Sequence, residues 1–197
     1  MLEQPPAFDE AHDVVLAQPF CAHHLHRGLI QAGRADLLLA NLRERWGAMI
    51  QAGSTTLWEI WSPLASQCHA WSTTPTFDLS TYVLGITPLT DGFVKALIAP
   101  QLLDLTWVQG RFPTPQGAIE LAWERNEQTF QLTLILPDAM PFELRLPFTA
   151  TSITVNDQLA WALGRPNSMI DGLAIEIDSG VARLVGARGG TYSIVAS

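Results

Sequence analysis

The first half of the chain has the hydrophobic pattern of amphipathic helices. Apolar residues recur at spacings of three and four, which gather them on one side of a helix. The spacing predicts helices over 19–32 and 34–51, with Gly33 ending the first, and a third over 76–84 that Gly85 ends. We expect the first two to form an antiparallel hairpin.

After residue 92 the period of the pattern shortens to two. Alternating apolar and polar residues, interrupted by Gly and Pro about every ten positions, are typical of short strands. The expected strands cover 103–109, 118–125, 129–136, 141–146, 151–155, 173–177, 182–185 and 190–195. Strands at this spacing favour an antiparallel β-sandwich. The sequence therefore predicts an α+β protein, with a helical region over 1–92 and a β-sandwich domain over 93–197.

The chain has few charged residues relative to its number of hydrophobic residues. Charged residues make up 15% and hydrophobic residues 48%, whereas soluble domains average about 25% charged. A compact core of ordinary type explains this composition. So does an apolar surface covered by a partner, which here means a homo-oligomer formed through the Leu- and Trp-rich helical region.

Charge and hydropathy exclude several partners. The net charge is −8, without a basic stripe to neutralise phosphates, so we expect no nucleic-acid binding. No apolar run is long enough to span a membrane, and residues 1–6 lack the features of a signal peptide.

Cys21 and Cys68 form no paired motif and are expected to be buried free thiols. Together these features predict a cytoplasmic protein.

The histidines and glycines predict neither a metal site nor a cofactor. His12, His23, His24 and His26 are close in sequence, but helical zinc sites prefer two histidines four residues apart. A His-rich helix face is the simpler interpretation. No nucleotide-binding or serine-hydrolase motif occurs, and Gly186–Gly190 is typical of a turn between strands.

Residues 55–72 concentrate the side chains most suited to chemistry. They are one carboxylate, one imidazole and three indoles: Glu59, His69, Trp58, Trp61 and Trp71. Aromatic faces stack on the C–H faces of sugars, and Glu and His can bind hydroxyl groups or transfer protons. The pattern indicates a sugar-binding or sugar-cleaving surface. Glycoside hydrolysis normally uses two carboxyl groups, and this segment supplies one.

Each of these residues also has a plain structural explanation. Glu59 can be a carboxylate on an exposed loop or helix, and His69 a hydrogen-bonded histidine of the core. The three tryptophans can simply be core residues, since the spacing of Trp58 and Trp61 is ordinary in helix packing.

A series of motifs in this region resembles the C-terminal end of bacterial α-L-rhamnosidases of glycoside hydrolase family 78. The motifs are Thr55–Glu59, Ser66–Ser72, Pro75–Phe77, Tyr82–Pro88 and Ile98–Gln101, preceded by Arg45–Gly47 and followed by Pro113–Gly117. They occur in the family's order, and the resemblance extends over essentially the whole chain.

The resemblance implies part of an (α/α)6 toroid of helical hairpins, followed by a C-terminal β-sandwich. The family hydrolyses terminal α-L-rhamnosides with inversion, so it implies a rhamnose-containing glycoside as the partner. Glu59 then corresponds to the general base that activates water, and His69 to a residue that contacts the sugar. Trp58, Trp61 and Trp71 correspond to walls of the pocket.

The chain has no residues that match the motif of the family's general acid. In the family the acid belongs to an acidic motif far upstream of the base, and Glu3, Asp9, Glu10 and Asp13 match no part of that motif. We therefore expect a truncated relative that is inactive or nearly so by itself. The alternative is a non-catalytic protein that binds carbohydrate or assembles through its helices.

Overall fold

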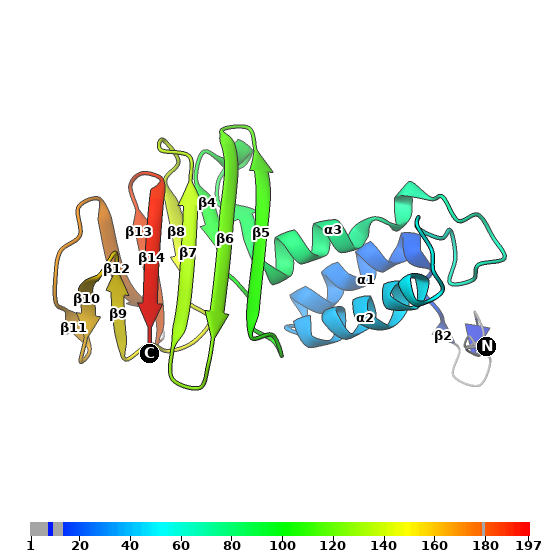
Figure 1. Cartoon of the computed structure of the whole chain (residues 1–197), viewed down its shortest axis with the longest axis horizontal. Coiled ribbons are helices and arrows are strands. Elements are labelled where there is room, and N and C mark those ends of the chain that lie inside the picture. Colours follow the sequence, from blue (N-terminus) through cyan, green and yellow to red (C-terminus); the bar gives the residue numbers. More distant parts are fainter. Residues whose placement is uncertain (1–7, 10–13, 179) are drawn as a thin grey trace. The chain divides into compact units, whose positions relative to one another are not determined.

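The chain divides into two compact units of different structure. A computed structural model describes residues 8–9, 14–178 and 180–197, and its contacts separate Met1–Leu79 from Ser80–Ser197. The described part of the first unit is mainly helical and that of the second is built of strands, so the predicted α+β class is confirmed (Figure 1). Of the residues weighed for metal or acid chemistry, Glu3, Glu10, His12 and Asp13 lie outside the described ranges.

The helical hairpin of the first unit forms as the spacing predicts. Helix α1 (Pro19–Gln31) is followed by α2 (Ala35–Gln51), and the two lie side by side (Figure 1). Gly33, at φ 70°, supplies the left-handed conformation that turns the chain between them. One face of α2 is buried, formed by Leu38, Leu42, Trp46 and Met49. A short β1 (Phe8–Asp9) pairs antiparallel with β2 (Val14–Val15).

The third predicted helix forms over nearly its whole predicted length, but its second half is π-helical. A 3₁₀ turn η1 (Ala70–Ser72) leads into α3 (Thr74–Asp78), and the chain then widens into the π-helical turn η2 (Leu79–Val83). Gly85 follows at φ 78°, where a Cβ atom would lie 2.2 Å from the carbonyl oxygen of Ala99, so only glycine fits. The residues after it, which the sequence assigned to the helical region, form strand β3 of the second unit.

The second unit consists of two sheets. The seven-stranded sheet has the order β11 (Arg165–Pro166), β10 (Gln158–Ala162), β9 (Ser152–Val155), β14 (Gly190–Ala196), β7 (Phe130–Leu136), β6 (Gly117–Arg125), β5 (Trp107–Thr114). The five-stranded sheet has the order β12 (Leu173–Asp178), β13 (Val181–Gly186), β8 (Phe142–Arg145), β4 (Ala96–Ile98), β3 (Ile86–Pro88). The 3₁₀ turn η3 (Asp91–Phe93) connects β3 to β4.

The expectation of a purely antiparallel sandwich is wrong at one pair. Strand β4 pairs with β8 in parallel, because the chain between them runs through β5, β6 and β7 of the other sheet and returns in the same direction. Most other strands begin and end close to their predicted positions. The strand expected over 103–109 begins only at Trp107 and continues to Thr114. The prediction missed β1, β2, β3, β4 and β11, whose two or three residues are too few for alternation to be recognised, and it also missed the five-residue β10.

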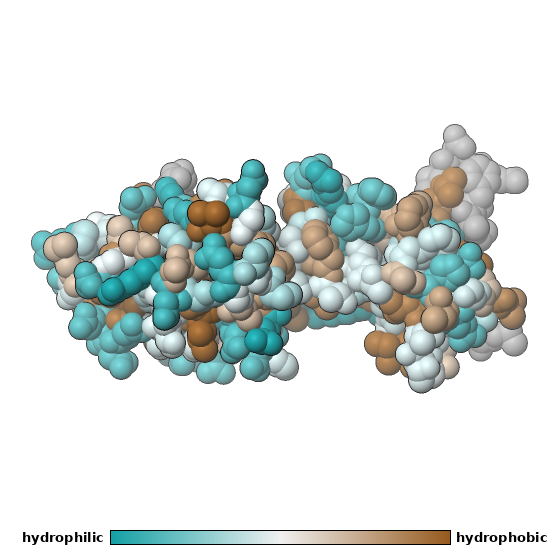
Figure 2. All heavy atoms as spheres, turned by 90° about the horizontal axis from the view of Figure 1, so that it is seen from above, coloured by the Kyte–Doolittle hydropathy of each residue, from teal (hydrophilic) through white to brown (hydrophobic). Residues whose placement is uncertain are grey.

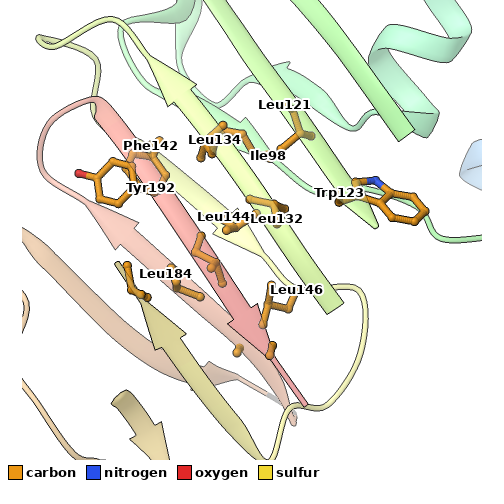
Figure 3. Packing of buried hydrophobic residues seen from close by; sticks show 14 of the residues in the cluster. Ile98, Leu121, Trp123, Leu132, Leu134, Phe142, Leu144, Leu146, Leu184 and Tyr192 are labelled. Atoms are coloured by element: carbon orange, nitrogen blue, oxygen red, sulfur yellow. The ribbon is translucent and has the colours of Figure 1, made fainter. Parts of the chain in front are cut away.

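One hydrophobic cluster joins the facing sides of the two sheets. On β7 the alternate residues Phe130, Leu132, Leu134 and Leu136 are all buried, and they belong to the same cluster as Phe142, Leu144 and Leu184 of the other sheet (Figure 3). Burial of each such side chain contributes about 2 kcal/mol. A Cβ atom on Gly186 would lie 2.0 Å from the Phe142 ring, so the ring fills the space that a side chain would need.

A buried carboxylate stabilises the outward side of the five-stranded sheet. Glu143, on β8 between two core residues, is 3% exposed. Its Oε2 accepts a hydrogen bond from Arg183 at 2.8 Å, and its Oε1 accepts one from Arg145 Nε at 2.7 Å. The bonds from Arg183 lower the pKa of Glu143 below its usual value, against the opposing effect of burial, and Arg145 lowers it further.

Replacing Glu143 by Gln should destabilise the second unit by about 1–3 kcal/mol at pH 7, because two arginines lose their anionic acceptor. A carboxyl group with a lowered folded pKa stabilises above its unfolded pKa, about 4.3, and this contribution disappears as pH falls through the lower folded value. The gap in unfolding free energy between wild type and E143Q should therefore shrink below about pH 4. Urea unfolding at several pH values measures it.

Glu120→Gln is the matched control, since the Arg111–Glu120 pair is exposed and should contribute at most about 1 kcal/mol. Equal losses in the two variants at pH 7 would contradict the role given to Glu143.

Candidate functional site

The segment 55–72 folds back on itself after α2 and brings its two ends together. The backbone N–H of Glu59 donates to the carbonyl oxygen of Ser66 at 2.8 Å. The backbone N–H of His69 donates to the carbonyl oxygen of Leu57 at 3.0 Å. These two bonds hold Glu59 and His69 next to each other, although ten positions separate them in the sequence.

The Glu59 carboxylate and the His69 imidazole form a partly exposed pair. Oε1 of Glu59 lies 3.8 Å from Nε2 of His69, and the two side chains are 35% and 27% exposed. Nδ1 of His69 is buried and has no partner among the described residues. Nε2 is therefore the ring atom with which His69 can contact Glu59 or a ligand.

Aromatic side chains extend this pair into a larger surface. Trp71 stacks on His69 with ring centroids 4.5 Å apart and planes tilted by 37°. Phe20, from α1, packs against Trp71 with ring centroids 5.4 Å apart. Trp71 is 47% exposed and Phe20 54% exposed. We call Glu59, His69, Trp71 and Phe20 the Glu59 surface. Sequence patterns did not indicate Phe20, since only the fold brings α1 to this position.

The other two candidate tryptophans lie in the interior. Trp58 and Trp61 are 4% and 5% exposed. The indole N–H of Trp61 donates to the carbonyl oxygen of Ala17 at 2.7 Å, and its ring packs edge-on against Trp46 at 4.8 Å. The indole N–H of Trp58 donates to the Ser54 hydroxyl. Both support the segment that carries Glu59. A contact between them and a ligand stays a prediction.

Ser72 connects the segment to α2. Its hydroxyl donates to the carbonyl oxygen of Trp58 at 2.6 Å, and its own carbonyl oxygen accepts the indole N–H of Trp46 at 2.9 Å. Ser72 is fully buried. The end of the segment, and with it the neighbouring Trp71, is thus attached to the core of the first unit by polar contacts.

The His-rich face of α1 contains a buried structural network. His26 is fully buried, with Nδ1 2.7 Å from an Asp78 carboxylate oxygen and Nε2 3.0 Å from Asn41 Oδ1. Thr74 donates to the same Asp78 oxygen at 2.9 Å. Burial tends to lower the pKa of His26, but the bonds to Asp78 and Asn41 and the Asp78 charge outweigh it, so that its pKa is raised. Sequence analysis named His26 but missed these partners.

The described residues also bear on three other features considered from the sequence: a metal site, a membrane-spanning helix and the two cysteines. Within the described ranges, no group of His, Cys, Asp and Glu side chains is arranged to hold a metal ion. None of the helices described is long and apolar enough to cross a membrane. The expectation that Cys21 and Cys68 are buried is wrong, because both are exposed. Cys21 lies off the buried face of α1, and Cys68 lies in an exposed part of the 55–72 segment.

Comparison with known sequences points to one group of enzymes. Residues 85–160 match the family described as "Bacterial alpha-L-rhamnosidase C-terminal domain". An α-L-rhamnosidase of Alteromonas sp. (strain LOR) is 30% identical over 126 residues, which are 55% of this chain and 14% of that protein. The chain therefore spans a small part of the length of this relative.

Comparison with solved structures covers more of the chain. The α-L-rhamnosidase from Dictyoglumus thermophilum matches 91% of this chain and 20% of its own, with a TM-score of 0.76 and 20% identity, which shows a shared fold. The GH78 rhamnosidase of Bacillus sp. GL1 matches 61% of this chain and 13% of its own, with a TM-score of 0.53 and 36% identity.

The first unit should become less stable as pH rises from 6 to 9. A histidine with a raised folded pKa stabilises fully below its unfolded pKa, about 6.5, and its contribution is lost as pH rises through the higher folded value. His26→Gln should remove this pH dependence and cost about 1–3 kcal/mol at pH 6, because a buried carboxylate loses its cationic donor. Thermal unfolding followed by circular dichroism at about 222 nm reports on the helices.

The exposed His24, on the same helix, is the control, and His24→Gln should leave the profile unchanged. An unchanged slope in H26Q would contradict the assignment.

Proposed function

Because this chain is similar to the C-terminal part of bacterial α-L-rhamnosidases, we propose that its Glu59 surface is the base side of a site that hydrolyses terminal α-L-rhamnosides. Glu59 is the general base, His69 contacts the sugar, and Trp71 and Phe20 form an aromatic wall. The observation that carries the proposal is the partly exposed Glu59–His69 pair, 3.8 Å apart, with an indole stacked on the imidazole.

The chemistry requires Glu59 to act on water. In inverting hydrolysis a carboxylate removes a proton from a water molecule, which attacks the anomeric carbon as the glycosidic bond breaks. A carboxylic acid on the other side of the sugar gives a proton to the leaving oxygen, and the two carboxyl groups are about 6.5–9.5 Å apart. The half-exposed side chain of Glu59 leaves room for that water. Nε2 of His69 is 3.8 Å from the carboxylate, too far for a direct hydrogen bond, and in the proposed site it binds a sugar hydroxyl.

The hairpin of α1 and α2 is also part of the proposal. We propose that α1 and α2 are one helical hairpin of an (α/α)6 toroid of the kind the family resemblance implies. Several apolar side chains of the first unit are exposed, among them Ile50 at 74% and Leu64 at 95%, and Figure 2 shows hydrophobic residues among polar ones on its surface. Further helices, or a second copy of the chain, would bury such residues.

The general acid has no counterpart in the segment that carries Glu59. We propose that these 197 residues lack the general acid and that another chain would have to supply it, so that by themselves they cleave ordinary rhamnosides slowly or not at all. If no acid is supplied, the same surface binds rhamnose without cleaving its glycosides, which is the second candidate function. A single carboxylate in the Glu59 surface favours it.

A substrate whose leaving group needs no protonation allows the contribution of the general base to be measured in the absence of the general acid. Fluoride leaves without prior protonation, whereas an alkoxide leaves only when it is protonated, so the chain should hydrolyse α-L-rhamnosyl fluoride while releasing little methanol from methyl α-L-rhamnoside. Glu59→Gln should lower the rate of fluoride release about 100-fold, since a general base typically contributes 10²–10⁴. A fluoride electrode and product NMR measure rate and inversion. Equal rates for wild type and E59Q would refute the role of Glu59.

Titration with L-rhamnose tests whether Trp71 belongs to the aromatic wall of the proposed site. Titration with L-rhamnose should change the tryptophan fluorescence of the wild type, and Trp71→Ala should weaken binding about tenfold through the loss of stacking. Trp107→Ala, at an exposed tryptophan of the other unit, is the matched control. Its affinity for L-rhamnose at the Glu59 surface should equal that of the wild type. Unaltered affinity in W71A would remove Trp71 from the site.

A further inference from the structure

A second surface suited to a ligand lies on the outward face of the seven-stranded sheet. Three neighbouring cavities of about 340, 380 and 270 Å³ lie over β5, β6 and β7. Two of them share Trp107, Glu124 and Gln131, and two share Gln109, Ala122 and Thr133. Shared linings make the cavities one continuous groove, which we call the Trp107 groove. It lies wholly within the second unit.

The strand register explains how the groove forms. Trp107, Glu124 and Gln131 are cross-strand neighbours in one row, and Gln109, Ala122 and Thr133 form the next. Ala122 is a small residue of β6 on this face, placed between Glu120 and Glu124. A methyl group between two longer side chains leaves a depression in the middle of the sheet, bordered by the amide of Gln109 and the hydroxyl of Thr133.

The groove combines one large aromatic face with a dense set of hydrogen-bonding groups. Trp107 is 67% exposed at the edge strand β5, although an indole on a strand usually packs against neighbours. Along the strands the rows from Trp107 to Arg111 extend about 13 Å. That length accommodates two or three linked sugar rings rather than one small molecule.

The charges lining the groove cancel. Arg111 pairs with Glu120 at 3.3 Å. Arg125 donates from Nε and Nη2 to the backbone carbonyl oxygens of Leu105 and Leu103 at 2.8 and 2.9 Å, so part of its hydrogen-bonding capacity is used within the unit. Glu124 contributes one negative charge beside Trp107. Two arginines and two glutamates thus give no field that attracts phosphate or an acidic polymer.

From these observations we propose that the Trp107 groove binds a neutral oligosaccharide. Trp107 stacks on the C–H face of one sugar ring, and Gln109, Gln131 and Thr133 exchange hydrogen bonds with hydroxyl groups. A protein partner fits less well, because protein interfaces are depleted of charged residues at their centre, whereas Glu120 and Glu124 lie on both sides of Ala122. The proposal does not depend on the Glu59 surface, which lies in the other unit.

Native affinity electrophoresis of the full chain in gels containing xyloglucan, galactomannan or polygalacturonate tests the proposal. Isothermal titration with cellotetraose, xylotetraose and mannotetraose then measures affinity. A neutral glycan should retard the wild type and polygalacturonate should not. Trp107→Ala should weaken binding about tenfold or more, and Met169→Ala, at a side chain that is 98% exposed and lines none of the three cavities, should bind like the wild type.

Ala122→Gln fills the depression while leaving Trp107 in place, and it should also weaken binding. Circular dichroism shows whether each variant keeps its strands. The proposal is overturned if no neutral glycan binds the wild type, if polygalacturonate binds better, or if folded W107A and A122Q both bind as the wild type does. Rhamnosyl fluoride hydrolysis by W107A should equal that of the wild type, so failure here and failure of the Glu59 surface are distinguishable.

Discussion

Burial of alternate residues between the two sheets is the constraint on which the second unit depends. Because side chains alternate along a strand, once Leu132 and Leu134 enter the core, Gln131 and Thr133 must point outward. The same register puts Trp107, Ala122 and Glu124 on the outward face of the neighbouring strands. The core thus determines which residues line the Trp107 groove, and a slip of one residue would exchange the groove with the core.

Buried polar contacts fix the arrangement of the first unit beside its apolar core. The hydrogen bonds of His26 to Asp78 and Asn41 join α1, α2 and α3 at one point, and Ser72 attaches the end of the 55–72 segment to Trp46 of α2. Buried polar groups of this kind specify one geometry, because each loses several kcal/mol when its partner moves away. The Glu59 surface depends on that geometry, since α1 supplies Phe20 and the 55–72 segment supplies the rest.

Local patterns predicted most of the elements and failed where tertiary contacts override them. The hairpin of α1 and α2 and most strands of the sandwich follow from periodicity and turn residues. Periodicity could not show that residues 79–83 form a π-helical turn, or that Ile86, just after the predicted helix, joins a sheet. It could not reveal the parallel pairing of β4 with β8 either, because that depends on a connection through the other sheet.

The sequence by itself indicated the α+β class, the resemblance to the C-terminal part of α-L-rhamnosidases, and the 55–72 segment, with Glu59, His69 and three tryptophans, as the place suited to chemistry on a sugar. These depend on residue types and local spacing, which are properties of the chain. Only the tertiary structure decided that Trp58 and Trp61 are buried while Trp71 is exposed, that Phe20 joins it, and that Trp107 borders a groove. Exposure and proximity are set by packing between segments far apart in sequence, so no local pattern can contain them.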